Sequence, residues 1–134
     1  MLQNMLVDEA SYREVEWQDC YYKFCQFRQF SPEGILCSAD FSHCQFDQLD
    51  WYSGSFHSVT FIACRFQGCV FRGTSFWDCR FIQCVLIDCL FVADNLGGAC
   101  IFDGTQAWDS QIQNCLGYGF KQMKLVSIAS ATDV

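Results

Sequence analysis

The side chains of this chain that could do chemistry are eleven cysteines, two histidines and an excess of carboxylates. Cysteines can form disulfides, bind metal ions or act as nucleophiles, and a histidine beside a hydroxyl or thiol can act as a general base. The cysteine count is odd, and the N-terminal residues carry acids where a secretory signal needs a basic start and an apolar run. We therefore expect a cytoplasmic protein without a disulfide framework.

The sequence contains none of the common signatures of a catalytic or metal site. It has no Cys-x-x-Cys pair, no glycine-rich phosphate loop and no nucleophile elbow. His43 and His57 are predicted to project from different faces, with no serine or cysteine nucleophile pointing outward beside them. We therefore predict no enzymatic activity, no catalytic residues, no metal and no cofactor.

The cysteines follow a five-residue period. From Phe41 to Ile101, every fifth residue is large and apolar. The core predicted from these positions consists of Phe41, Phe46, Trp51, Phe56, Phe61, Phe66, Phe71, Phe76, Phe81, Leu86, Phe91 and Leu96. Most residues two places earlier are small, and the core is predicted to include the cysteines among them, Cys44, Cys64, Cys69, Cys79, Cys84 and Cys89.

This period fits neither the 3.6 residues of a helical turn nor the 2.0 of a straight strand. A chain that points every fifth residue inward must turn a corner once per repeat, so four repeats close a coil of about 20 residues, and coils stack about 4.8 Å apart. Phe41, Phe61, Phe81 and Ile101 should then form one column. Stacked cysteines hold their side chains parallel, which disfavours disulfides, so we expect buried thiols.

The period is interrupted twice. Upstream the same spacing is kept by Tyr12, Trp17, Tyr22 and Phe27. Phe41 then comes one residue early, which predicts a register slip near residues 28–37, at the Ser-Pro-Glu-Gly segment, and makes Cys37 the cysteine expected to be most exposed. Downstream of Leu96 the phase slides by one. We predict a β-helix over residues 1–116 and a C-terminal cap over 117–134 whose final eight residues are frayed.

These repeats resemble the pentapeptide-repeat family over about residues 10–112. The resemblance implies an all-β fold, a right-handed quadrilateral β-helix, here of about four to five coils with a non-repeat C-terminal cap. Cysteine and phenylalanine replace the commoner alanine and leucine, which is similar to the branch that includes quinolone-resistance proteins. That branch implies DNA mimicry, in which an acidic rod binds DNA gyrase or topoisomerase IV.

The charge distribution gives this implication little support. A net charge of −7 argues against direct nucleic-acid binding, and the longest apolar run, 96–102, is far too short to span a membrane. The acids are concentrated in the N-terminal coil, and Asp94 falls at an inward position. The projecting loops carried by the longer topoisomerase-protecting members are not evident. DNA mimicry is therefore kept as the alternative function.

Outward-facing apolar residues become more frequent toward the C-terminal end. They are predicted to form a protein interface consisting of Ile62, Val70, Trp77, Ile82, Val85, Ile87, Leu90 and Val92. Exposed β-strands rich in branched residues explain the same pattern equally well. We predict a scaffold that binds a protein through a side wall, the partner being a second copy, the chain's own tail or another protein. A cysteine-based redox or metal sensor ranks third.

Overall fold

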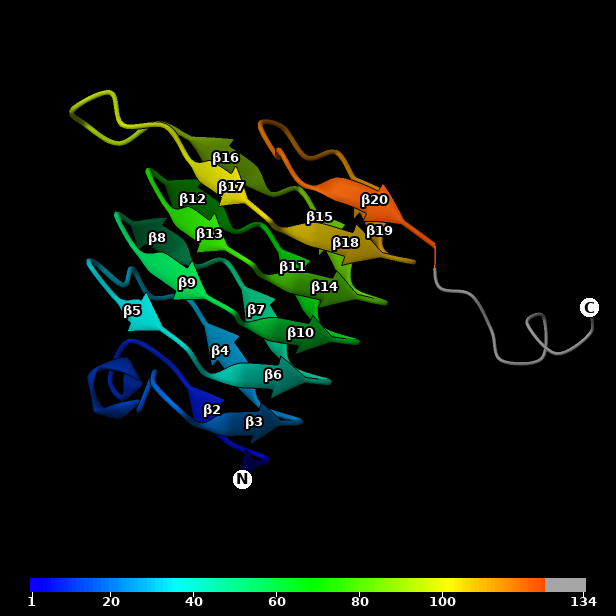
Figure 1. Cartoon of the computed structure of the whole chain (residues 1–134). Coiled ribbons are helices and arrows are strands. Elements are labelled where there is room, and N and C mark those ends of the chain that lie inside the picture. Colours follow the sequence, from blue (N-terminus) through cyan, green and yellow to red (C-terminus); the bar gives the residue numbers. More distant parts are fainter. Residues whose placement is uncertain (125–134) are drawn as a thin grey trace, which may run out of the picture.

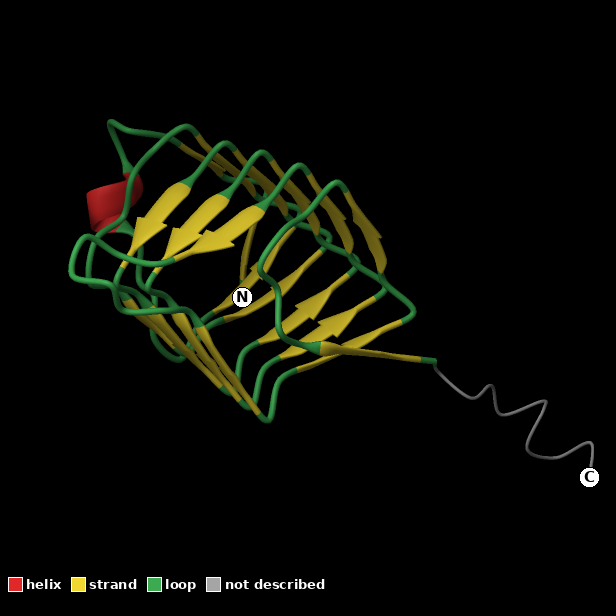
Figure 2. Cartoon of the chain, turned by 90° about the horizontal axis from the view of Figure 1, so that it is seen from above, coloured by secondary structure: helices red, strands yellow, loops and turns green. Residues whose placement is uncertain are grey.

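The computed structural model describes residues 1–124, in which short strands wrap around the four sides of a rod. In Figure 1 the chain runs from left to right along the near side and returns along the far side while it climbs, so the coil is right-handed. Figure 2 shows the strands of successive coils stacked in parallel rows. The predicted fold class, an all-β quadrilateral helix of about four to five coils, is confirmed, and the structure has about five. Within the described residues, no helix is long and apolar enough to cross a membrane.

Two of the four sides are long parallel sheets. Sheet A contains β1 (Leu2–Gln3), β3 (Tyr21–Lys23), β6 (Asp40–Ser42), β10 (Thr60–Ile62), β14 (Arg80–Ile82), β18 (Gln106–Trp108) and β20 (Lys121–Met123). Sheet B contains β2 (Leu6–Val7), β4 (Gln26–Arg28), β7 (Gln45–Asp47), β11 (Arg65–Gln67), β15 (Val85–Ile87) and β19 (Gln111–Gln113).

The other two sides are shorter. Sheet C contains β8 (Asp50–Tyr52), β12 (Val70–Arg72) and β16 (Leu90–Val92). Sheet D contains β5 (Leu36–Cys37), β9 (Ser55–His57), β13 (Ser75–Trp77) and β17 (Ile101–Asp103). On the side of sheet C, the first two coils have a 3-10 turn, η1 (Tyr12–Glu14), and an irregular segment at residues 31–34 instead of strands.

Each repeat is a three-residue strand followed by a corner. The central residue of the strand points inward, its two neighbours point outward, and the next residue takes a left-handed backbone conformation, as at His43 (φ 53°) and Gln48 (φ 55°). The residue after the corner points inward again. This geometry explains why two of every five side chains are buried, which neither helical nor strand periodicity would produce.

Stacked rings fill the interior of the rod. Phe61 lies between Phe41 and Phe81, with ring centroids 5.4 and 4.9 Å away and near-parallel planes. Every residue of the predicted core is buried except Leu96, which is 95% exposed. Ile101 also leaves its expected column, because Phe81 pairs with Ala107 and Ile101 pairs with Ser75.

Both departures arise from a loop of residues 93–99 between β16 and β17, which projects from the rod near its C-terminal end (Figure 1). The loop adds six residues, so Phe76 pairs with Phe102 and later strands follow the shifted phase that the sequence predicted. The expectation that no projecting loop is present is therefore wrong. Asp94 does not point into the core but is half-buried in this loop, where it accepts hydrogen bonds from the amides of Leu96 (2.9 Å) and Gly98 (2.8 Å).

The upstream register slip lies after the predicted segment. Tyr22 pairs with Phe41, and Cys37 pairs with Phe56, so both are 19 residues from their partners. Pro32 is buried at the regular inward position, five residues before Cys37. The repeat that is one residue short therefore lies between Cys37 and Phe41. Cys37 is therefore an interior residue, 1% exposed, and the expectation that it is the most exposed cysteine is wrong.

The C-terminal end of the described chain is closed by a shortened coil. Strand β20 pairs with β18, and Phe120 lies over the core with its ring 5.2 Å from that of Phe81. The predicted fraying of the last eight residues lies outside the described residues.

Candidate functional site

The eleven cysteines are free thiols, and eight of them are buried. Seven of the eight buried thiols donate to a backbone carbonyl of the preceding coil, as Cys84 does to Phe61 O at 3.2 Å. Thr105 and Ser110 replace cysteine in the last coil and donate in the same way, to Phe76 O (3.0 Å) and Phe81 O (3.1 Å). The thiols therefore act as small core residues that satisfy carbonyl groups between coils.

Burial suppresses the ionisation of two of these thiols. It raises the pKa of Cys37 to about 12 and that of Cys79 to about 11. A thiol with so high a pKa carries almost no thiolate at neutral pH and is a poor nucleophile and metal ligand. Within residues 1–124, no group of three or more His, Cys, Asp or Glu side chains could hold a metal ion.

The raised pKa values predict a loss of stability in alkali. The unfolded thiol ionises near pH 8.5, whereas Cys37 and Cys79 keep their protons in the folded chain. From about pH 9 upward, the free energy of unfolding should therefore fall by up to about 1.4 kcal/mol per pH unit for each thiol, until the pH reaches the folded-state pKa of that thiol, about 11 for Cys79 and about 12 for Cys37. Urea unfolding at pH 7, 9 and 10.5 measures the slope. The double variant Cys37→Ala/Cys79→Ala should show a shallower slope, and an unchanged slope would contradict this account.

The histidines do not lie as expected. Ser55 and His57 both point outward from β9, and Ser55 Oγ lies 2.6 Å from Nε2 of His57, so the expectation that no serine lies beside an outward histidine is wrong. The ring of Trp77 stacks on His57 at 6.4 Å. Among the described residues, no hydrogen bond orients Nδ1 of His57, so the pair lacks the third group that completes a nucleophilic triad. His43 contacts the ring of Phe24 at a corner.

The predicted interface residues do not share one wall. Ile62 and Ile82 lie on sheet A, Val85 and Ile87 on sheet B, Val70, Leu90 and Val92 on sheet C, and Trp77 on sheet D. The outward positions of a strand were identified correctly, but the coil distributes them over four faces. Sheet C holds three of the eight in two adjacent strands, where Val70 pairs with Leu90.

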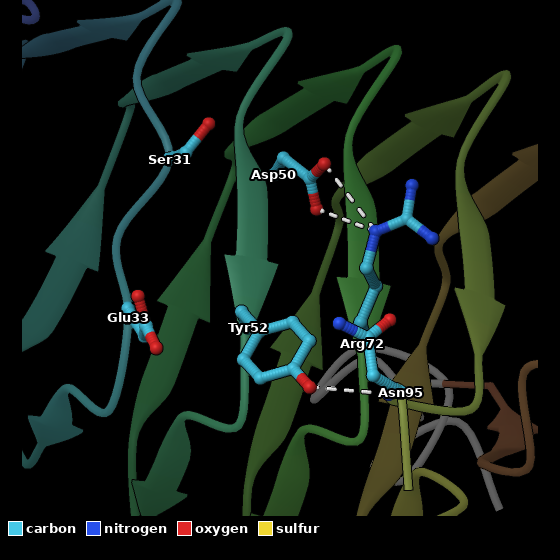
Figure 3. A pocket seen from close by; sticks show the side chains of 6 residues that line it. All are labelled: Ser31, Glu33, Asp50, Tyr52, Arg72 and Asn95. Atoms are coloured by element: carbon cyan, nitrogen blue, oxygen red, sulfur yellow. Dashed lines mark hydrogen bonds and ion pairs between the residues drawn. The ribbon is translucent and has the colours of Figure 1, made fainter. Parts of the chain in front are cut away.

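Sheet C also borders a groove of about 400 Å³. Its walls are formed by six polar residues, Ser31, Glu33, Asp50, Tyr52, Arg72 and Asn95 (Figure 3). Glu33 comes from the irregular segment below β8 and forms a bridge with Tyr52, and Asn95 comes from the loop of residues 93–99. The two irregular segments of the coil therefore flank the same groove, about three coils apart.

Two contacts hold the groove in shape. Arg72 Nε donates to both carboxylate oxygens of Asp50, at 3.0 and 3.3 Å, and Figure 3 shows its terminal nitrogens directed away from that carboxylate. Tyr52 Oη accepts from the backbone amide of Asn95 at 3.1 Å, which ties the loop to the sheet. Among the described residues, the phenol proton of Tyr52 and the terminal guanidinium nitrogens of Arg72 donate no hydrogen bond.

The loop needs glycine where it meets the sheet. Gly73 has a φ of 54°, and a Cβ atom there would lie 2.6 Å from a carboxylate oxygen of Asp94. Asp94 can therefore approach the corner after β12 only because this corner has no side chain. Sequence reasoning missed the groove, although the turn-forming residues Asp94, Asn95, Gly97 and Gly98 were a visible signal of a loop.

Comparison with known proteins identifies the repeats. The sequence profile of the pentapeptide repeats family matches residues 55–91 in eight copies. These residues lie in the most regular part of the coil, and this part of the chain consists of pentapeptide repeats. No curated protein matches its sequence.

Among solved structures, one similar chain is trypsin-treated QnrB1, described as a plasmid-mediated fluoroquinolone resistance protein. The two chains are 14% identical over 98% of this chain and 93% of QnrB1, with a TM-score of 0.26.

Proposed function

We propose that this protein is a non-enzymatic scaffold that binds a protein partner, and that the sheet C face is where the partner docks. The main support is that two irregular segments, residues 31–34 and 93–99, flank this face, with the groove between them. Loops held on a rigid framework are the usual place for binding residues.

The chemistry of this face suits a protein surface. It carries the charged and hydroxyl groups of the groove, and beside them the apolar side chains of Val70, Leu90 and Val92 on strands β12 and β16. Leu96 at the loop (95% exposed) and Leu116 (69% exposed), which forms a bridge with Leu90, add apolar area at the same end. Apolar residues beside a polar rim are the usual composition of a protein interface.

The alternative, DNA mimicry toward gyrase or topoisomerase IV, is weakened by the order of the charges. A mimic needs rows of like charge in place of the phosphates. Along one outward column of sheet B, however, Arg28, Asp47 and Gln67 follow one another, so the sign changes between coils. On sheet C, Asp50 is paired with Arg72. A redox or metal sensor is weakened by the burial of most of the thiols.

The proposal is tested by two matched aspartate substitutions. Proteins captured from a lysate on the purified chain are identified, and the affinity of the purified partner is then measured by calorimetry. We expect Leu90→Asp, on strand β16 of sheet C, to weaken binding about 30-fold or more, because it places a charge in the contact area. Ile87→Asp, on sheet B, should bind within about twofold of the unchanged chain. Equal binding by both variants would overturn the docking face, and failure of the chain to bind any purified candidate would overturn the function.

A further inference from the structure

A second outward feature lies on sheet A, away from the groove. Four apolar side chains form a continuous column on neighbouring strands, because Ile62 pairs with Ile82, Ile82 with Trp108, and Trp108 with Met123. All four point outward; Ile62 is 37% exposed and the others are half-buried. We call these four residues the apolar ladder. A tryptophan within such a column is the residue type most often found at the centre of a protein interface.

The same face is basic, although the chain carries a net charge of −7. Lys23, Arg80 and Lys121 point outward from its strands, against one acid, Asp40, which gives the face a charge of +2. Lys124 follows β20 directly.

The basic groups of this face are not neutralised within the described residues. Arg80 Nη2 donates to the hydroxyl of Thr60 at 3.1 Å, and no carboxylate pairs with Arg80 or Lys121 there. Asp40 is itself engaged, since one of its oxygens accepts from the backbone amide of Thr60 at 2.8 Å. Three more acids, Asp19, Asp78 and Asp109, are exposed at the edges of the face rather than on its strands. The face therefore presents two basic residues, Arg80 and Lys121, on either side of Gln106 in one column, which we call the basic column and which lies beside the apolar ladder.

We propose that the sheet A face binds an acidic amphipathic segment of a protein partner, with apolar side chains on the ladder and carboxylates on Arg80 and Lys121. The strands of the face are about 4.8 Å apart, which is close to the 5.4 Å pitch of an α-helix. The ladder spans three such steps, about 14 Å, which corresponds to roughly 10 residues of helix. A helix with adjacent apolar and acidic stripes matches both columns.

Two other occupants fit this face less well. A second copy that used its own sheet A face would bring two basic columns together, which charge repulsion opposes. Duplex DNA would contact the basic column, but it offers no continuous apolar strip for the ladder, and the acidic remainder of the chain repels it. The proposal does not depend on the docking face of sheet C, because the two surfaces share no residue.

The test uses defined peptides and a matched charge reversal. The probe is a blocked peptide of about 14 residues that alternates pairs of leucine and glutamate, a length sufficient to cover the ladder. The reference peptide has lysine in place of every glutamate. Binding is measured by fluorescence anisotropy at low salt, and each variant is first checked for an unchanged thermal midpoint. We expect the glutamate peptide to bind at least about 10-fold more tightly than the lysine peptide.

Arg80→Glu/Lys121→Glu should reverse this preference. The control variant Arg28→Glu/Arg65→Glu changes the net charge of the chain by the same amount, but on sheet B. It should still bind the glutamate peptide more tightly than the lysine peptide. Ile82→Gln should weaken binding of the glutamate peptide by about 10-fold, and Ile87→Gln should not.

Three results would overturn the proposal: equal binding of both peptides, the same loss in both charge-reversed variants, or tighter binding of a short DNA duplex than of the glutamate peptide. A folded dimer that dissociates in Ile82→Gln would assign the face to a second copy instead.

Discussion

Replacing Phe61 by alanine is expected to destabilise the chain by about 3–5 kcal/mol, the usual cost of deleting a large buried ring. Phe61 is 1% exposed and contacts the rings of the coils below and above it, as well as that of Phe66 in its own coil at 5.1 Å. A whole domain is stable by only about 5–15 kcal/mol, so this one change removes much of the total. Urea unfolding followed by circular dichroism measures the loss.

The matched control is Phe24→Ala. Phe24 is 49% exposed at a corner and contacts only His43 and Lys23 among the ring and cation contacts of the described chain. Its removal should change the free energy of unfolding by less than about 0.5 kcal/mol, as surface changes usually do. If both variants lost the same stability, the rings of the rod would not be its core.

The sequence was sufficient to predict the sides of the rod, because its two inward positions are set by residue size alone. Phe41 to Phe91 repeat without interruption, and each lies where the period places it. The period could not distinguish Leu96 from a core residue, because this leucine meets the spacing by coincidence. The turn-forming residues around it, Asp94, Asn95, Gly97 and Gly98, carried the contrary signal.

The upstream slip was misplaced for a different reason. Proline and glycine in the Ser-Pro-Glu-Gly segment indicate a break, but Pro32 is buried at a regular inward position, and its carbonyl accepts from the amide of Tyr52 at 3.0 Å. The repeat that is one residue short follows Cys37, and no turn-forming residue indicates a break there. Cys37 takes the inward position that a large apolar residue usually holds, so the sequence did not show that the five-residue spacing continues to Cys37.

The surface sites were only partly predictable. Ser55 and His57 are two residues apart on one strand and must therefore point to the same side, so strand periodicity alone predicts their contact. The groove could not be predicted, because it requires that residues 31–34 and 93–99 lie on the same side of the coil. That depends on the number of corners between them, and hence on the correct position of the slip.

Removing residues 93–98 is expected to preserve the fold and abolish partner binding. The deletion joins Val92 to Ala99 and places Phe102 five residues after Phe91, with Cys100 two residues before it, so the regular repeat is restored. The lost contacts, among them the bond from Asn95 to Tyr52, are exposed, and a shorter loop costs less closure entropy. The free energy of unfolding should therefore change by less than about 1 kcal/mol.

The same deletion removes one wall of the groove, together with Leu96. We expect the affinity for the partner to fall about 30-fold or more. Leu96→Ala should reproduce part of this loss. The control is Leu36→Ala, because Leu36 is also an exposed leucine but lies on sheet D. This variant should bind the partner as tightly as the unchanged chain.

The most direct test of the docking face is therefore to measure unfolding and partner affinity on the same preparation of the chain that lacks residues 93–98. The account predicts a native unfolding curve and a binding loss of about 30-fold or more. A variant that folds and binds as tightly as the unchanged chain would contradict it, because the partner would then dock elsewhere on the rod.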